Sequence, residues 1–248
     1  MFHIIDSHLH CGVQKVSWGW EELRRRLKTA GIGGAGLIPP VEDIYDRYDF
    51  HFTDPPAWQA CRRQAHQYLL DLHDPHIHLY RYFFVWNDFA WEELSPEHVA
   101  IKWHRHANEP EYHYDDPRCR EFLKVVQVRG LPILLEETFQ NTLFFLERLL
   151  PAGVPLIIPH LGGLNGGYMA LRRAGVWDHP QVYADTALAS TWEMADYVDR
   201  WGSARLLFGS DYPFGEPAYE LAKVQSLNLP ESDRQAILGG NFRRLAGL

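Results

Sequence analysis

His8 and His10 are two residues apart at the end of the first apolar run of the chain. Successive side chains of a strand point to opposite faces, so both imidazoles would project from one face if residues 3–8 form a strand. Two neutral imidazoles presented side by side supply half of the ligands of a divalent-metal site. A polar pair at a strand end is the simpler interpretation of this motif alone. The positions of the other metal-ligating residue types therefore decide between the two interpretations.

Short apolar runs bounded by Gly, Pro or Asp alternate along the chain with longer helical patterns. The predicted strands lie near residues 3–8, 33–38, 77–85, 98–103, 132–136, 155–159, 181–186 and 205–210. The predicted helices lie near residues 19–30, 56–72, 88–94, 116–129, 140–150, 165–174, 189–201, 216–227 and 231–245. Strand–helix alternation builds a parallel sheet, and eight such units predict a single (β/α)8 TIM barrel spanning residues 1–248.

Barrel enzymes carry their chemistry at the C-terminal ends of the strands, and this rule tests the candidates. Metal-ligating residue types follow the predicted strands at five places: His8 with His10, His104, Glu136, His160 and Asp211. Another pair of the same spacing, His76 and His78, precedes its strand and would lie at the opposite end, so we exclude it. The long loops at 39–56 and 104–115 would lie at the same end as the candidates.

Several motifs in chain order carry a resemblance to a known family. They include Ile5-Asp-Ser-His-Leu-His10, Ile101-Lys-Trp-His104, His160-Leu-Gly-Gly163 and Leu207-Phe-Gly-Ser-Asp-Tyr-Pro213. The chain resembles the amidohydrolase superfamily, in particular the amidohydrolase 2 branch that includes aminocarboxymuconate-semialdehyde decarboxylase. The resemblance implies that His8 and His10 bind a metal and that Asp211 binds the metal or activates its water. It also implies that His160 acts as an acid–base group or binds a second metal.

Glu136 departs from the family pattern, in which a histidine follows this strand. The segment reads Pro132-Ile-Leu-Leu-Glu136, and a carboxylate can replace an imidazole as a ligand or bridge two ions. The sequence therefore leaves both one ion and two ions open. Lys102 shares the face of His104 one layer deeper, where a buried lysine needs a carboxylate partner.

These residues together predict a metal-dependent hydrolase acting on a small ester, lactone or amide. A divalent ion, zinc in the first place and manganese in the second, would lower the pKa of a bound water toward about 7. Asp211 would take a proton from that water and deliver it to the leaving group, and His160 would polarise the carbonyl or hold a second ion. The predicted ligands are His8, His10, Glu136, His160 and Asp211, with His104 as a further candidate.

Two other functions stay open on the same scaffold. One is a metal-dependent, non-oxidative decarboxylase or a hydratase of unsaturated or aromatic carboxylic acids. The other is a metal-free binding barrel that keeps the fold without the chemistry. The Gly-rich stretch at 31–36 follows a predicted helix instead of a strand, which argues against dinucleotide binding.

The bulk composition restricts the partners. A net charge of −8 argues against nucleic acid or an anionic membrane as the main partner, because both require concentrated Lys and Arg. Three scattered cysteines are too few for a disulfide framework and indicate a reducing compartment. The first strand begins too close to Met1 to leave room for a signal peptide, so we expect a cytoplasmic enzyme with a small-molecule substrate. The oligomeric state stays open, a homo-oligomer included.

Overall fold

The computed structural model describes residues 3–12 and 18–247 and forms one eight-stranded sheet. The strands are β1 (Ile4–His10), β2 (Ile32–Ile38), β3 (His78–Phe84), β4 (His98–His104), β5 (Ile133–Glu136), β6 (Leu156–Ile158), β7 (Val182–Asp185) and β8 (Leu206–Leu207). They pair in chain order, and each pair is parallel. The segment after β8 then joins β1: Ser7 N donates to Phe208 O at 2.9 Å and His10 N to Tyr212 O at 2.8 Å. These bonds close the sheet, which confirms the predicted (β/α)8 barrel.

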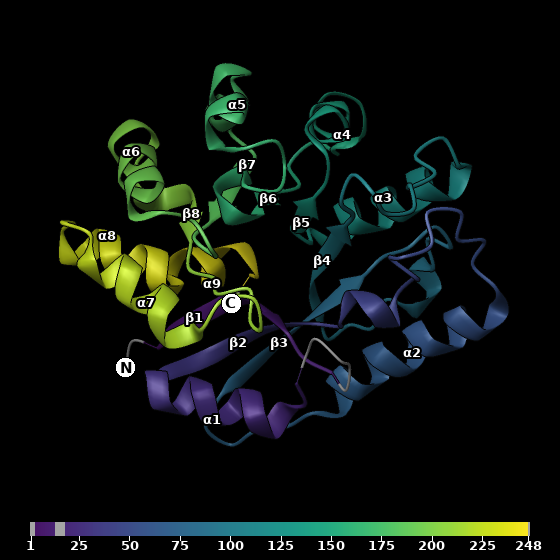
Figure 1. Cartoon of the computed structure of the whole chain (residues 1–248), viewed down its shortest axis with the longest axis horizontal. Helices are drawn as coiled ribbons and strands as arrows, with labels where there is room; N and C mark the ends of the chain where they lie inside the picture. The colour runs from purple at the N-terminus through teal and green to yellow at the C-terminus, as the bar shows by residue number, and fades with distance from the viewer. Residues whose placement is uncertain (1–2, 13–17, 248) are drawn as a thin grey trace.

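The α-helices follow one another around the outside of the strands (Figure 1). They are α1 (Trp20–Ala30), α2 (Pro56–Asp71), α3 (Pro117–Arg129), α4 (Phe139–Phe144), α5 (Tyr168–Arg173), α6 (Thr191–Trp201), α7 (Pro217–Ser226), α8 (Glu231–Gln235) and α9 (Asn241–Leu245). Local sequence sets both ends of α3. At its start the Asp116 side chain accepts from Arg118 N and Pro117 occupies the first turn, and at its end Gly130 adopts a left-handed φ of 64°. None of the helices in the described ranges is long and apolar enough to cross a membrane.

Two helix predictions need correction. Residues 88–94 form only a short 3-10 turn at Trp91–Glu93, because Phe89 takes a φ of 42°, which α-helical backbone does not tolerate. The helix predicted at 231–245 is interrupted at 236–240, where Gly239 leaves the helical conformation. A Cβ at Gly239 would lie 2.9 Å from the carbonyl oxygen of His3. The close approach of this segment to the start of β1 therefore requires glycine.

The strands are buried on both faces, as expected for a parallel barrel covered by helices. Apolar residues such as Leu134 and Ile157 fill most of the strand positions. The exceptions gather at the C-terminal end of the barrel, where fully buried polar side chains replace the apolar ones: Asp6, His8, Lys102 and Asp185. Since unpaired polar groups are costly to bury, these side chains need polar partners at this end: His8 contacts both Asp185 and Lys102, and Asp6 accepts from backbone N–H groups.

Candidate active site

The end of β1 and the segment after β8 form a compact group of metal-ligating side chains. His8 Nε2 lies 3.2 Å and His10 Nε2 3.4 Å from the same oxygen, Oδ1 of Asp211. The ligand atoms of these three residues, which we call the first donor group, all lie within 4.8 Å of one another. Two imidazole nitrogens and a carboxylate oxygen are a donor set that zinc and manganese accept.

The outer nitrogens of both imidazoles are held by neighbouring acceptors. His8 Nδ1 lies 2.9 Å from Asp185 Oδ2, and His10 Nδ1 lies 3.1 Å from the carbonyl oxygen of Pro39. When Nδ1 donates its proton to such an acceptor, the Nε2 lone pair faces the centre of the group. Burial, followed by the charge of Lys102, holds the pKa of His8 well below its usual range. His8 is therefore a neutral imidazole, the form that binds metals.

Asp211 occupies a backbone conformation that few residues adopt. Its φ is 55°, in the left-handed region, and its backbone N donates to His8 O at 2.7 Å. Such a conformation costs on the order of 1–3 kcal/mol and persists where surrounding contacts impose it. Burial opposes ionisation of Asp211, but His8 and His10 outweigh it and lower its pKa. The strained turn thus presents an ionised carboxylate to the two imidazoles.

His160 also lies in the left-handed region, with φ 58°, directly after β6. Its backbone N donates to Asp185 Oδ1 at 2.8 Å, and its Nδ1 lies 3.1 Å from Ala187 O. Its Nε2 faces Glu136 Oε2 at 3.5 Å and Asp211 Oδ2 at 3.8 Å, and this buried atom has no hydrogen-bond partner among the described residues. Burial opposes protonation, but the two carboxylates raise the pKa of His160 to about 9.

Glu136 lies with a different set of imidazoles. It is paired in register with His104 across β4 and β5. Its Oε1 lies 3.2 Å from His104 Nε2 and 2.6 Å from His106 Nε2. The ligand atoms of His104, His106 and Glu136, which we call the second donor group, also lie within 4.8 Å of one another. The structure thus divides the five predicted ligands: Glu136 is separate from the first donor group, and His160 lies between the two groups.

Lys102 contacts one residue of each donor group. Its side chain is fully buried, with Nζ 3.2 Å from His8 Nε2 and 3.1 Å from Glu136 Oε2. Glu136 is the carboxylate partner that burial of this lysine requires. Burial opposes ionisation of Glu136, but His104 and Lys102 hold its pKa well below the usual range. Asp6 lies apart from these contacts, since its Oδ1 accepts from the backbone N of Ser210 at 2.9 Å and of His8 at 3.2 Å.

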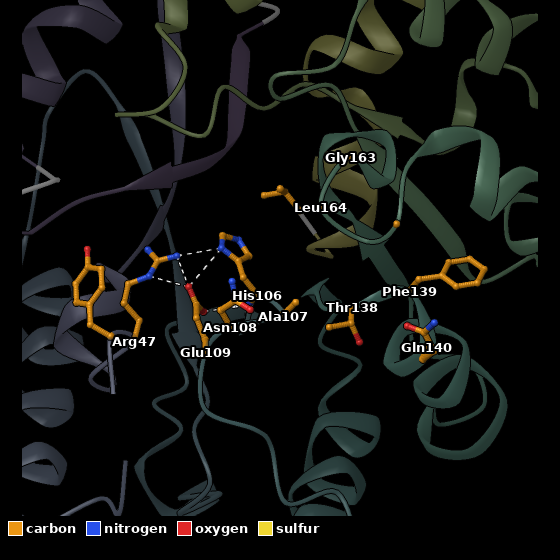
Figure 2. Close-up of a pocket in the computed structure, with 12 residues that line it drawn as sticks. Arg47, His106, Ala107, Asn108, Glu109, Thr138, Phe139, Gln140, Gly163 and Leu164 are labelled. Carbon is orange, nitrogen blue, oxygen red and sulfur yellow. Dashed lines mark hydrogen bonds and ion pairs between the residues drawn. The ribbon is translucent and has the colours of Figure 1, made fainter. Parts of the chain in front are cut away.

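Both donor groups face one cavity of about 150 Å³, which His10, His104, Glu136 and Asp211 line. Partly exposed apolar side chains, Leu164, Leu188 and Phe214, form its rim. A larger cavity of about 1070 Å³ adjoins it and shares Arg47, His106 and Leu164 with it. Figure 2 shows Arg47, Glu109 and His106 directed toward one another at one side of the larger cavity.

Sequence reasoning assigned no role to two side chains that the structure places at the site. Asp185 is the last residue of β7 and orients both His8 and the backbone of His160. The rule that chemistry follows strand ends, applied to β7, could have found it. His106 completes a second His-x-His spacing with His104, and that spacing was the available signal. Asp185 also forms a group with His8 and His160, but its two oxygens are occupied by orienting hydrogen bonds.

The residues fit a divalent ion on two observations. The first donor group directs two imidazole nitrogens at one carboxylate oxygen, and an acceptor holds the outer nitrogen of each ring. A family model for amidohydrolases matches residues 14–248. The matched range begins after His8 and His10, so the family model does not cover these two residues. Their place in the site rests on the geometry of β1. Among curated proteins, none matches the chain.

Solved structures with a similar fold include both decarboxylases and hydrolases. A 2,6-dihydroxybenzoate decarboxylase in complex with 2,6-dihydroxybenzoate is 16% identical, has a TM-score of 0.74 and matches over 100% of each chain. A protein assigned as a 2-pyrone-4,6-dicarboxylic acid hydrolase from Pseudomonas putida is 16% identical, with a TM-score of 0.73 over 100% of this chain and 98% of that chain. A dihydroxybenzoic acid decarboxylase from Polaromonas sp. JS666, with bound manganese and the inhibitor 2-nitroresorcinol, is 15% identical, with a TM-score of 0.70 over 100% and 98%. At these identities the similarity shows the fold.

Proposed function

The chain belongs to the amidohydrolase family, and we propose that it is a metal-dependent hydrolase of small esters, lactones or amides. One arrangement carries the proposal. Asp211 Oδ1 faces both imidazoles of the first donor group, while Asp211 Oδ2 faces His160 Nε2 at 3.8 Å. One ionised carboxylate thus adjoins both a cation site and a proton-bearing imidazole, which is what acid–base catalysis of hydrolysis requires.

His8, His10 and Asp211 would hold the ion, for which zinc is the first candidate and manganese the second. When bound, a divalent ion would lower the pKa of a water ligand and polarise the substrate carbonyl. Asp185 keeps His8 in the tautomer that exposes Nε2 to this site. The backbone N of Asp211 donates to His8 O and that of His160 donates to Asp185 Oδ1, and these bonds fix the positions of the two acid–base groups before substrate arrives.

Asp211 is the base of the proposed reaction. It is ionised, buried and adjacent to the cavity, so it accepts a proton from the attacking water and passes it to the leaving group. His160 carries a proton at neutral pH because its pKa is raised to about 9. Its Nε2 is directed into the gap between Glu136 and Asp211, where it can donate to an oxygen that gains negative charge.

The charge of the cavity favours hydrolysis over decarboxylation. Two carboxylates with lowered pKa, Glu136 and Asp211, line the small cavity, whereas the ammonium of Lys102 is fully buried and the lining guanidinium of Arg47 is paired with Glu42 and Glu109. A neutral ester, lactone or amide carbonyl meets less repulsion there than a second carboxylate does. A cytoplasmic location belongs to the same proposal and is supported by the three free cysteines, Cys11, Cys61 and Cys119.

The test is a paired substrate panel. Purified protein supplied with zinc or manganese is assayed for acid release from esters, lactones and amides, and for carbon dioxide release from aryl and muconate-type acids. We expect hydrolysis of at least one carbonyl class and no carbon dioxide. Carbon dioxide release without hydrolysis would replace the hydrolase by the decarboxylase. Metal below about a tenth of an equivalent in protein purified without chelators would favour a metal-free binding barrel.

A further inference from the structure

The end of β4 carries a His-x-His pair of its own, with the spacing of His8 and His10. His104 is the last residue of β4, and His106 lies in the loop that follows it. Both Nε2 atoms face Oε1 of Glu136, at 3.2 Å and 2.6 Å. Glu136 reaches this position because β5 pairs with β4 in a register that places it beside His104.

Each outer nitrogen of these two imidazoles lies near an oxygen that can accept its proton, and that of His106 also lies near Arg47. His104 Nδ1 lies 3.1 Å from the hydroxyl oxygen of Tyr45, which in turn donates to Glu109 Oε2 at 2.7 Å. His106 Nδ1 lies 3.3 Å from Glu109 Oε1, and Figure 2 shows Glu109 between Arg47 and His106. Metal-ligating histidines are usually held in this way, by an outer carboxylate or hydroxyl that fixes the tautomer. Glu109 is a buried carboxylate that serves both rings.

We propose that the second donor group, His104, His106 and Glu136, binds a second divalent cation. Two imidazoles and one carboxylate suit zinc, manganese or cobalt, and further ligand positions face the cavities that His104 and His106 line. His106 Nδ1 lies 3.2 Å from Arg47 Nη2 as well as 3.3 Å from Glu109 Oε1, and its Nε2 lies 2.6 Å from Glu136 Oε1. A bound ion would take the Nε2 lone pair of His106, which would place the ring proton on Nδ1, where Glu109 would accept it. Ion pairs with Glu109 and Glu42 offset the charge of Arg47.

Lys102 keeps the two cation sites separate. Its Nζ lies between His8 Nε2 and Glu136 Oε2, at 3.2 Å and 3.1 Å. It therefore occupies the space in which a ligand shared by two ions would have to lie. The two oxygens of Glu136 therefore differ in use: Oε2 faces Lys102, and Oε1 faces the imidazoles of His104 and His106. We expect two ions that load independently. This inference goes beyond the proposed function, which uses only the ion of the first donor group. Cation binding at the second donor group can be measured without any substrate.

The experiment is a metal titration of the full chain. Metal-free protein is titrated with cobalt and followed by its visible absorption, and bound zinc is counted after equilibrium dialysis by elemental analysis. We expect about two equivalents in the unmodified protein and about one in His106→Ala. The side chain of His106 is 35% exposed, so its truncation leaves the core intact. His113→Ala removes an exposed histidine of the same loop and is expected to keep both equivalents.

The remaining variants separate this inference from the proposed function. His10→Ala is expected to keep only the ion of the second donor group, and Glu136→Gln only the ion of the first. A single ion in the unmodified protein that His106→Ala retains and His10→Ala loses would overturn the second site and leave the hydrolase proposal standing. Two ions retained in both His106→Ala and Glu136→Gln would also overturn the second site. Absence of any bound ion would overturn both proposals.

Discussion

Replacing Asp185 by asparagine tests how the barrel prepares His8 for a cation. Asp185 Oδ1 accepts from the backbone N of His160 at 2.8 Å and of Ala187 at 3.1 Å. These two donors will hold the oxygen of an asparagine in the same place, so its amide nitrogen will replace Oδ2, which lies 2.9 Å from His8 Nδ1. The amide will then donate to Nδ1 and force the ring proton onto Nε2. That atom lies 3.2 Å from Asp211 Oδ1, within the first donor group.

The expected effect is a weaker first site with the fold preserved. Loss of a hydrogen bond that orients a ligand typically costs about 10–100-fold in metal affinity, which is about 1.4–2.7 kcal/mol. Because the asparagine reverses the tautomer as well as removing the acceptor, we expect the upper end of this range. Asp178→Asn is the matched control, since Asp178 is an exposed carboxylate that accepts from Trp201 Nε1 at 2.8 Å, away from the site.

The assay is a competition for zinc between metal-free protein and a fluorescent chelator. Asp185→Ala separates the two causes: it removes the acceptor without supplying a donor, so its affinity is expected to fall less than that of Asp185→Asn. A zinc affinity for Asp185→Asn within about two-fold of the unmodified protein would refute the tautomer argument. Equal losses in the alanine and asparagine variants would show that the lost acceptor, and not the reversed tautomer, is responsible.

Three further predictions concern catalysis, pH and packing. His160→Gln should lower kcat by about 100-fold or more with the zinc content unchanged, because its Nε2 lies outside the first donor group; loss of zinc would make His160 a ligand instead. Burial lowers the pKa of His66 to about 3 and of His98 to about 4, from 6.5. Both therefore stay neutral in the folded protein, so their contribution to the free energy of unfolding is complete above pH 6.5 and is lost as the pH falls below it. Together they should lower the free energy of unfolding by about 4 kcal/mol between pH 7 and pH 5, and urea denaturation of His66→Phe should show about half of that slope; an unchanged slope would contradict the assignment. In Gly36→Ala the new Cβ would lie 2.5 Å from Ser7 O, which should cost about 1–3 kcal/mol by thermal unfolding, whereas Gly19→Ala, with its nearest contact at 3.6 Å, should lie within about 0.5 kcal/mol of the unmodified protein.

The alternation of apolar runs and helical patterns was sufficient to predict the barrel. The β5 strand ends at Glu136, where its apolar pattern ends, whereas β1 continues past its predicted end at residue 8 to His10. Strand ends in a closed parallel barrel share one rim. The short 3-10 turn at Trp91–Glu93 could not be predicted, since it depends on the left-handed conformation of Phe89. The local apolar pattern does not indicate a backbone conformation that depends on tertiary packing.

The candidate site could be predicted as a set of residues but not as two groups. Which imidazoles Glu136 faces depends on the register of β5 against β4, which one sequence does not specify. The approach of Tyr45 to Glu109 depends on how two long loops fold over the rim. Residues 41–49 and 104–109 lie far apart in the chain, and their contact follows from loop conformation.

Anomalous diffraction at the zinc edge, on crystals of zinc-loaded protein, tests the central claim most directly. We predict a peak about 2.0–2.2 Å from His8 Nε2, His10 Nε2 and a carboxylate oxygen of Asp211. Zinc bound elsewhere on the molecule, with these three side chains directed away from one another, would contradict it.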